Sequence, residues 1–445
     1  SVKLVMGLGF ALAGLFAFLW FKEIFGIWPA VVGAAMFQLA PYRFVNLYVR
    51  NAYGENMATL FIPLILWLIT KLIRQPSQKY LVFTSLAWAG LFLSHNAVSL
   101  MILPVIGIYS LWLIINSKSK FPAAVYLAIS GLLGLGLSAF FWLPAFVEGK
   151  YTLRDIVTAG DAFAAHFPSL FQLIVPSWGY DVSAPGPNDG MSFQLGLLQW
   201  LTFIMSCVII IKIKFRQPLL IIGWLVFIGS VFIMLPISLP GWHIITILGK
   251  FQFPWRFLTL SVVAAGLLAA GVAAELKASR LLAVIVILLL VAQTIWYWHP
   301  QGFLPQTEQE LISTYTGTTD TGESSPLWSV RFQEQPAPFG LSVVSGAPID
   351  YQIIRRQSEI HEYTVTATVD SQISDNTLYF PGWTAYVDNQ KRPITYADPN
   401  WRGEITFKVP AGTHQIKVVF EDTHLRRLAN VISLVSLTLL TALAL

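Results

Sequence analysis

The sequence predicts a polytopic α-helical membrane protein of about eleven spans with an antiparallel β-sandwich domain on its extracytoplasmic side. Three observations predict this fold. The chain of 445 residues is 55% hydrophobic and only 11% charged, whereas soluble domains have about 25% charged residues. Apolar segments of near-spanning length recur along most of the chain. A polar block near the C-terminus instead alternates apolar with polar residues, as β-strands do.

Eleven segments are apolar enough to cross a membrane, and several contain Gly or Pro, which membrane helices tolerate. They lie at about 3–21, 27–41, 56–74, 80–94, 97–116, 121–143, 193–213, 218–236, 256–275, 281–298 and 428–445. We therefore expect a multi-span transmembrane domain over 1–298 and a final transmembrane helix over 428–445.

Positive charge in the short loops predicts the orientation. The Lys and Arg residues of five alternate loops fall on one side, which the positive-inside rule makes cytoplasmic. They are Lys22; Lys71, Arg74 and Lys79; Lys118 and Lys120; Lys212, Lys214 and Arg216; and Lys277 and Arg280. The other side then carries outer loops at about 42–55, 144–192 and 237–255. In this orientation Ser1 lies outside, so we expect at least one span and its outer loop before residue 1.

The block 299–427 is too polar for the bilayer and predicts a compact antiparallel β-sandwich outside it. The alternation identifies strands in "EYTVTATV", "LYFPGWTAYVD", "EITFKV" and "HQIKVVFED". The stretch "VPAGTHQIKVVFE" predicts a hairpin-like edge with its turn at Pro410–Gly412. The stretch 303–330 is rich in Thr, Gly, Ser and Gln, which predicts a loop or linker.

Several kinds of function lack their sequence signals. Cys207 is the one cysteine, so neither a disulfide framework nor a Cys-based metal site is possible within the chain. The sequence contains no P-loop, GxSxG or zinc-binding spacing. The net charge of +5 comes mostly from the orienting loops, so we expect no nucleic-acid partner. No internal repeat is visible, so the inverted-repeat signature of secondary transporters is missing.

The strongest functional candidate is the outer stretch "YRFVNLYVRNAYGEN", 42–56, where charged residues and Tyr53 border an apolar run. Arg43 and Arg50 can bind phosphate through charge and forked hydrogen bonds. Glu55 can coordinate a divalent cation or act as an acid or base. The alternative is that these side chains only anchor a helix end at the interface, with Glu55 stabilising the N-terminus of the next helix.

Two further outer stretches carry polar residues at helix ends. In "LSHNAVS", His95 and Asn96 could bind a pyrophosphate, a metal or a sugar hydroxyl, or Asn96 could simply cap the next helix. In "GKFQFPWRFLTLS", Lys250, Gln252 and Arg256 precede another helix, and Arg256 could meet a lipid phosphate. Pro254 in the same stretch suits a helix N-terminus, and an ordinary interfacial anchor is the alternative.

The outer loop "PSWGYDVSAPGPNDGMSFQLG" offers possible metal or sugar ligands, with turn chemistry as the alternative. The candidates are Asp181, Asn188 and Asp189. The preceding stretch, 158–177, predicts a short helix on the membrane surface, with Asp161 or His166 facing the site. The four outer stretches together predict one cavity at the outer interface that binds an anionic, lipid-linked substrate.

The motifs also resemble a known family. "PYRFVNLYVRNAYGENMA", "LSHN", "WLPAFVE", "GPNDGMSFQLG" and "FQFPWRFL" resemble the bacterial membrane protein 6-pyruvoyl-tetrahydropterin synthase-related family. The block "LYFPGWTAYVDNQ" with "VPAGTHQIKVVFED" resembles the outer domain of bacterial YfhO-type membrane proteins. Nothing in the chain supports pterin chemistry. Both families resemble the GT-C membrane glycosyltransferases, which take a sugar from a polyprenyl phosphate or pyrophosphate on the outer face.

The resemblance implies roles for individual residues. "PYRFVNLYVRNAYGEN" is similar to the second outer loop of the oligosaccharyltransferase catalytic subunit. By that similarity Glu55 is the metal-linked or acidic residue, and Arg50 contacts the donor phosphate. The implied cofactor is a divalent cation, Mg or Mn. In GT-C enzymes the catalytic Asp lies in the first outer loop, which this chain would lack if it begins after that loop.

The resemblance thus implies a glycosyltransferase in the bacterial plasma membrane. Its partners would be membrane lipid, an undecaprenyl-phosphate sugar as donor, and a cell-envelope glycan or protein as acceptor. Arg43, Arg50, Lys250 and Arg256 would hold the phosphate. One alternative is a transporter or flippase of lipid-linked glycans, against which the nearly charge-free span interiors count. The other is a non-catalytic envelope scaffold whose β-domain binds a partner.

Overall fold

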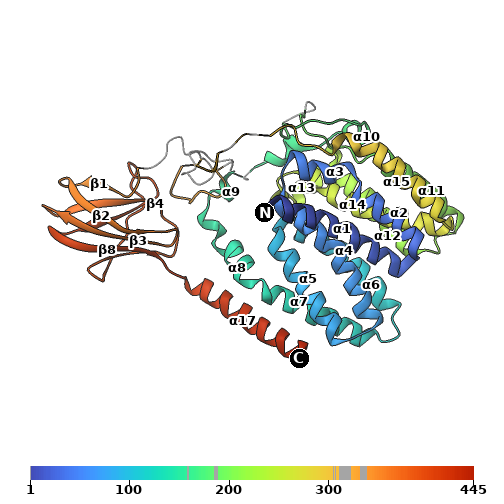
Figure 1. Ribbon diagram of the computed structural model, residues 1–445, viewed down its shortest axis with the longest axis horizontal. Coiled ribbons are helices and arrows are strands. Elements are labelled where there is room, and N and C mark those ends of the chain that lie inside the picture. Colours follow the sequence, from blue (N-terminus) through green and yellow to red (C-terminus); the bar gives the residue numbers. More distant parts are fainter. Residues whose placement is uncertain are drawn as a thin grey trace. The chain divides into compact units, whose positions relative to one another are not determined.

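The chain folds into two compact units. The structure, a computed structural model, describes residues 2–157, 160–184, 189–303, 305, 307–309, 322–330 and 338–445 (Figure 1). Unit 1 comprises Ser1–Trp142, Gly160–Leu304 and Ile432–Leu445. Unit 2 comprises Leu143–Ala159 and Pro305–Val431.

The predicted apolar segments all form helices. The α-helices are α1 (Val2–Phe25), α2 (Ile27–Gln38), α3 (Pro41–Phe44), α4 (Tyr53–Arg74), α5 (Gln78–Ser94), α6 (Asn96–Ile115), α7 (Lys120–Leu137), α8 (Ala139–Val147), α9 (Arg154–Val157), α10 (Leu170–Ile174), α11 (Leu197–Lys212), α12 (Pro218–Met234), α13 (Leu239–Ile244), α14 (Leu258–Glu275), α15 (Arg280–Thr294) and α17 (His424–Ala444). A π-helix spans Val45–Val49, and 3-10 turns span Glu148–Tyr151, Ala162–His166, Pro236–Ser238, Thr246–Phe251, Pro254–Phe257 and Ile295–Tyr297.

The lengths of these helices confirm a helical membrane protein with a β domain. Within the described residues, seven helices are long and apolar enough to cross a membrane, or up to eight if α12 and α13, which meet at a bend of 86°, form one span. Three other predicted spans are shorter helices: α2 has 12 residues, α11 has 16 and α5 has 17. The count of eleven spans therefore stays a prediction.

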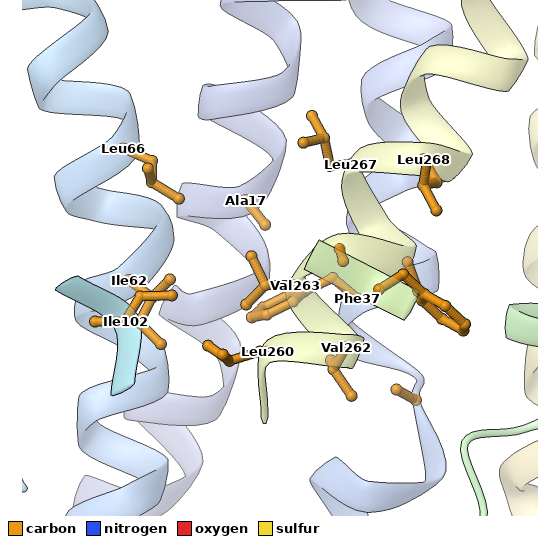
Figure 2. Close-up of a cluster of buried hydrophobic side chains, with 14 of the residues drawn as sticks. Ala17, Phe37, Ile62, Leu66, Ile102, Leu260, Val262, Val263, Leu267 and Leu268 are labelled. Carbon is orange, nitrogen blue, oxygen red and sulfur yellow. The ribbon is translucent and has the colours of Figure 1, made fainter. Parts of the chain in front are cut away.

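The core of unit 1 is built around α14. In the segment Pro254–Glu275, 94% of the apolar window is buried, and α14 packs against α2, α11 and α12, while α1 packs against α2 and α4. Figure 2 shows apolar side chains from α1, α2, α4, α6 and α14 meeting in this core. The crossing of α2 and α14 depends on Gly33 and Gly266: a methyl group at Gly33 would lie 2.7 Å from the Gly266 carbonyl oxygen. Small residues allow such close backbone approach between membrane helices.

An ion-pair network links the C-terminal ends of α1 and α4. Glu23, in the last turn of α1, accepts from Lys71 at 2.7 Å and lies 3.6 Å from Arg74. Both cations belong to a loop that the sequence assigns to the cytoplasmic side. Arg74 also donates to the Glu23 backbone carbonyl at 2.8 Å.

The segment 158–177 does not form the single surface helix that the sequence predicts. It contains the 3-10 turn Ala162–His166 and the separate helix α10. Extended backbone at Phe167 separates them, because the following Pro168 disfavours helical backbone at the residue before it. Ser169 then starts α10 with a capping box formed with Gln172.

Unit 2 contains a β-sandwich of two antiparallel sheets. Its strands are β1 (Leu341–Ser345), β2 (Ile349–Arg356), β3 (Ile360–Ala367), β4 (Ser371–Leu378), β5 (Trp383–Val387), β6 (Gln390–Arg392), β7 (Glu404–Val409) and β8 (Gly412–Phe420). One sheet has the order β1-β4-β7 and the other β2-β3-β8-β5-β6. Apolar residues from both sheets, among them Tyr363, Ile373 and Phe407, are fully buried between them. Leu143–Ala159, which the sequence places in an outer loop of the transmembrane domain, also belongs to this unit.

The predicted hairpin at Pro410–Gly412 is wrong. β7 pairs with β4, whereas β8 pairs with β3 and β5, so the chain crosses from one sheet to the other at this turn. Gly412 has φ +129, which lets the backbone change direction without a side-chain clash. The sequence also missed β1, β2, β4 and β6. One reason is that a strand such as "SQISDNTL" is polar at positions that the sandwich buries.

Candidate functional site

The stretch 42–56 forms a broken helix that ends at the start of α4. α3 begins at Pro41, and the π-helix Val45–Val49 continues it as far as Arg50. Asn51 has φ 49, a left-handed conformation that Asn tolerates better than most residues, and α4 starts two residues later. Single π-helical turns often mark functional sites. This break directs Arg50 back toward Glu55 in the first turn of α4.

Glu55 and Arg50 form a forked ion pair. Arg50 Nη1 donates to Glu55 Oε2 at 2.5 Å, and Nη2 donates to Oε1 at 2.7 Å. Arg50 Nη1 also donates to Asn46 Oδ1 at 2.6 Å and lies 3.3 Å from the Tyr42 hydroxyl. The Tyr42 hydroxyl lies 3.4 Å from Glu55 Oε2. These bonds leave Arg50 Nε and one Nη2 hydrogen without a hydrogen-bond partner among the described residues.

Arg256 reaches the same carboxylate from the start of α14. Pro254 begins the 3-10 turn that leads into this helix, as the sequence predicts. Arg256 Nε lies 3.2 Å from Glu55 Oε1, and Nη1 donates to the Phe251 carbonyl at 2.7 Å and to Gln252 Oε1 at 3.2 Å. In the described part of the chain, Arg256 Nη2 makes no hydrogen bond.

His95 completes the group from the turn between α5 and α6. Its Nδ1 accepts from the Val98 backbone N–H at 3.2 Å and so caps α6, whereas the sequence assigned this role to Asn96. Because Nδ1 accepts, Nε2 carries the proton of the neutral ring, and it lies 3.9 Å from Glu55 Oε1. Burial is the largest cause that lowers the pKa of His95; the Glu55 charge opposes it, and the Arg256 and Arg50 charges lower the pKa further. His95 is therefore a neutral N–H donor at pH 7.

We call these six residues the Glu55 cluster: Tyr42, Asn46, Arg50, Glu55, His95 and Arg256. Two guanidinium groups against one carboxylate leave the cluster with a net positive charge. The side chain of Glu55 is 2% exposed, whereas those of Arg50, Arg256 and His95 are 15%, 14% and 25% exposed. The carboxylate thus lies beneath its cationic partners, and the accessible part of the cluster consists of N–H donors.

Aromatic residues connect the cluster to the loop that follows α9. The Arg50 guanidinium lies 4.5 Å from the ring centroid of Trp255. Trp255 donates its indole N–H to Ser183 at 3.1 Å, and Ser183 also pairs with His166 Nδ1 at 3.0 Å. The His166 ring packs edge-on against Phe253. The guanidinium of Arg50 is therefore fixed on one face by a cation–π contact, which favours one orientation of its remaining donors.

The other residues predicted from the sequence lie apart from Glu55 or join it indirectly. Arg43 is buried, with its guanidinium 4.7 Å from the ring centroid of Phe10 and 5.1 Å from that of Phe37. Among the described residues, its side chain makes a hydrogen bond only to Gln38. Asp189 accepts from Gln172 and from the Ala184 backbone, as a turn residue does. Gln252 joins the cluster through its hydrogen bond with Arg256. The side chains of Tyr53, Asn96 and Lys250 are exposed. Asn188 lies outside the described residues.

The cluster does not fit a divalent cation. Both Glu55 oxygens already accept from guanidinium groups, and the residues that the structure describes contain no group of three or more His, Cys, Asp or Glu side chains that could hold a metal ion. Mg²⁺ and Mn²⁺ prefer several carboxylate or other oxygen ligands. The expected Mg or Mn site therefore stays a prediction, and the donors present suit an anion.

The sequence did not identify Tyr42, Asn46 and Trp255 as members or neighbours of the cluster. A signal for the first two was present, because Tyr42, Asn46 and Arg50 recur at intervals of four, which is the spacing of one helix face. Trp255 gave no such signal, since an aromatic residue before an outer helix is also typical of the interfacial belt.

Comparison with known proteins adds little to this geometry. No protein-family model and no solved structure matches the chain. A stretch of 138 residues, 30% of the chain, is 28% identical to an uncharacterized protein of Lactococcus lactis subsp. cremoris. The match covers 22% of that protein, so it tests no function for this chain.

Proposed function

We propose that this chain is a membrane glycosyltransferase that binds the phosphate of a lipid-linked sugar at the Glu55 cluster. The observation that carries the proposal is the pair of guanidinium groups, Arg50 and Arg256, held by one buried carboxylate at the start of two apolar helices. Their unused N–H donors and the net positive charge suit an anion. An anion with a long lipid tail can reach such a place from the bilayer.

The two arginines would stabilise the leaving group. In the transfer, the bond between the sugar C1 and the phosphate oxygen breaks, and its electron pair stays on the lipid phosphate. C1 bonds to the oxygen of an acceptor hydroxyl, whose proton passes to the departing phosphate. Negative charge therefore grows on the phosphate in the transition state. Arg50 Nε and Arg256 Nη2 are donors without hydrogen-bond partners in the described residues, and fixed donors of this kind are worth most where new charge develops.

Glu55 and His95 have supporting positions. Glu55 orients Arg50 through two hydrogen bonds and Arg256 through one, so we assign it first to positioning these cations. The sequence also predicts that Glu55 acts as the acid or base of the reaction, and substitution of Glu55 tests that role. The neutral His95 ring can donate Nε2–H to a phosphate oxygen or to a sugar hydroxyl.

The cluster and the β unit would lie on the extracytoplasmic side of the bacterial plasma membrane. Support comes from the Lys and Arg residues of the opposite loops. The donor would be an undecaprenyl-phosphate sugar and the acceptor an envelope glycan or protein. The site would follow the GT-C pattern that the sequence resembles.

A transporter of lipid-linked glycans is the second candidate. The Glu55 cluster lies at helix starts, and each candidate span has a window with at most two charged residues. A transport pathway generally requires ionisable residues deep within the spans. The position of the cluster therefore favours surface chemistry over passage through the bilayer.

A turnover assay with matched controls tests the proposal. Protein in proteoliposomes is incubated with radiolabelled undecaprenyl-phosphate sugars and a cell-envelope extract as acceptor, and the release of lipid phosphate is followed. We expect Arg50→Ala and Arg256→Ala to lower turnover about 100-fold or more, the usual effect of losing one such donor. Arg74→Ala is the control, because Arg74 lies at the other end of α4 and pairs with Glu23.

The outcomes separate the alternatives. Loss of turnover in both cluster variants, with Arg74→Ala unaffected, supports the proposal. Turnover that persists in Arg50→Ala and Arg256→Ala would show that the phosphate binds elsewhere. Movement of labelled lipid between leaflets without release of its phosphate would favour the transporter.

A further inference from the structure

Unit 2 contains a cluster of half-buried aromatic side chains at the edge of its core, against which Tyr379 packs. Its members are Tyr151, Trp328, Tyr379, Phe380 and Tyr396, and we call them the aromatic cluster. The rings of Tyr379 and Tyr396 are parallel within 1°, with centroids 3.9 Å apart. Trp328 packs on both, at 5.4 Å from Tyr379 and 4.6 Å from Tyr396.

Backbone hydrogen bonds from three separate segments hold these rings together. Gly403 accepts from the Tyr379 N–H at 2.6 Å and donates to the Tyr396 carbonyl at 3.1 Å, which places the two tyrosines side by side. Tyr151 is joined to the segment before Trp328 in the same way: its carbonyl accepts from the Leu327 N–H at 2.8 Å. The Tyr151 ring then lies 6.0 Å from Trp328 and is nearly parallel to it.

The polar side-chain atoms of the aromatic cluster are available to bind a ligand. Among the residues that the structure describes, the hydroxyls of Tyr151, Tyr379 and Tyr396 and the indole N–H of Trp328 make no hydrogen bond. The core residue Tyr363 shows the contrast, because it is fully buried and its hydroxyl donates to Asp375 at 3.1 Å. A tyrosine used for packing pairs its hydroxyl, whereas these three hydroxyls remain available.

The available groups match a hydroxyl-rich ligand. Each phenol can both donate and accept a hydrogen bond, and the Trp328 indole adds a donor. Burial raises the pKa of Tyr379, and the neighbouring Tyr396 and Tyr151 raise it further, so the phenol keeps its proton. Lys150 Nζ lies 5.0 Å from the Tyr151 ring and adds a cation at the edge of the cluster. A proline-rich peptide offers carbonyl acceptors but few donors, so it would leave the acceptor capacity of the phenols unused.

We propose that the aromatic cluster of unit 2 is a carbohydrate-binding site. The C–H faces of sugar rings pack on the aromatic rings, and the phenol hydroxyls and the Trp328 N–H bond the sugar hydroxyls. Sugar sites generally combine apolar walls with a few placed polar groups. The site stands on unit 2 alone and does not require the glycosyltransferase activity of the Glu55 cluster, although a glycan held here would be a suitable acceptor.

Direct binding to the full chain tests the site. The purified protein in nanodiscs, without any lipid-linked donor, is titrated with cello-, chito- and galacto-oligosaccharides while calorimetry and tryptophan fluorescence are recorded. We expect at least one of these sugars to bind the unchanged protein. Trp328→Ala or Tyr396→Ala should lower the affinity for that sugar about tenfold or more.

Variants with smaller changes separate recognition from folding. Tyr379→Phe and Tyr396→Phe keep the rings and remove only the hydroxyls. They should lower the affinity for the sugar by a few-fold without lowering the midpoint of thermal unfolding. Tyr351→Ala is the aromatic control, because its ring contacts Tyr363 instead of the cluster, and it should bind the sugar as the unchanged protein does.

Three results would overturn the proposal. The first is no binding of any of these sugars to the unchanged protein at millimolar concentrations. The second is sugar binding that the cluster variants leave unchanged. The third is binding of a proline-rich peptide, but of none of the sugars, at the cluster. Loss of donor turnover in the Arg50 and Arg256 variants has no bearing on these results, so the two proposals fail separately.

Discussion

At the scale of single residues, Glu55 is a carboxylate enclosed by its own cations. Arg50 binds both of its oxygens, Arg256 binds one, and its side chain is 2% exposed. Removing one partner of a buried ion pair leaves the other charge without compensation. A partly exposed pair loses much less, because water replaces the missing partner.

Glu55→Gln should therefore lower stability far more than Glu23→Gln does. Both residues pair with two cations at an end of α4, but Glu23 is 22% exposed. We expect a loss of about 3–5 kcal/mol for Glu55→Gln and about 0–1 kcal/mol for Glu23→Gln. Thermal unfolding in detergent measures the difference, and equal losses would contradict the enclosed position of Glu55.

His95 has two roles that substitution can separate. Its Nδ1 caps α6, and its Nε2 faces Glu55. His95→Ala should cost about 1 kcal/mol of stability through the lost cap. His95→Asn should restore the cap, since Asn is a good capping residue, but not the donor at the Nε2 position. Donor turnover should thus stay low in His95→Asn while the thermal midpoint recovers, and recovery of both would mean that His95 is only a cap.

At the scale of elements, the glycines of α2 and α14 set how closely these helices pack. A methyl group at Gly33 would lie 2.7 Å from Ala270 Cβ and 2.7 Å from the Gly266 carbonyl oxygen. These two neighbours are a backbone atom and a short side chain, so they cannot turn away, and Phe21 Cδ2 would lie 2.9 Å from the same methyl group. The position of Arg256 relative to Glu55 depends on this contact, because Arg256 enters from the start of α14.

Gly33→Ala should destabilise the protein, whereas Gly107→Ala should not. Overpacking of this kind costs about 1–3 kcal/mol. Gly107 lies within α6 and would meet nothing within 4 Å, so alanine there should be neutral or favourable by about 0.5–1 kcal/mol. Unfolding of both variants in the same detergent tests this, and a stable Gly33→Ala protein would contradict the close α2–α14 crossing.

At the scale of the whole molecule, unit 2 has its own stabilising charge cluster. Arg356 in β2 and His361 in β3 bind Asp375 in β4, at 3.1 and 2.8 Å. These contacts join the two sheets. Burial alone would raise the pKa of Asp375, but hydrogen bonding and charge from His361, and the Arg356 charge, hold it below its ordinary value.

Unit 2 should therefore lose stability in acid. A carboxyl group whose pKa is lowered in the folded state contributes fully above its unfolded pKa of about 3.9, and the contribution disappears as the pH falls below that value. Asp375→Asn should be less stable at neutral pH and show a flatter acid dependence. Calorimetry of the full chain between neutral and acid pH checks both effects, and an unchanged acid dependence would contradict the role of Asp375.

The side of the membrane on which unit 2 lies can be tested with the single cysteine removed. In a Cys207→Ser background, Gln390→Cys in β6 should react with a membrane-impermeant maleimide on intact cells. Ser117→Cys, beside Lys118 in a predicted cytoplasmic loop, should react only after permeabilisation. The reverse labelling pattern would invert the topology and place the Glu55 cluster on the cytoplasmic side.

Local sequence patterns were enough to predict many of the helices and strands. Apolar runs identified the helices, Pro254 marked a helix start, and alternation located β3, β5, β7 and β8. Hydrophobicity and backbone preference act over a few residues, so a single chain displays them. The count of spans did not follow, because apolar character alone does not set where helices such as α2 and α11 end.

Tertiary structure alone decided which residues meet. Arg50, His95 and Arg256 come from three separate parts of the chain, and only helix packing brings them to Glu55. The sequence grouped Arg43 with them. Arg43 directly follows Tyr42 in α3, so its side chain points to a different face of the helix, toward Phe10 and Phe37. The crossing at Pro410–Gly412 was hidden for the same reason, since strand pairing joins residues far apart in the chain. Charge and spacing in the sequence predict which residues are candidates for the site, and helix packing determines which of them meet.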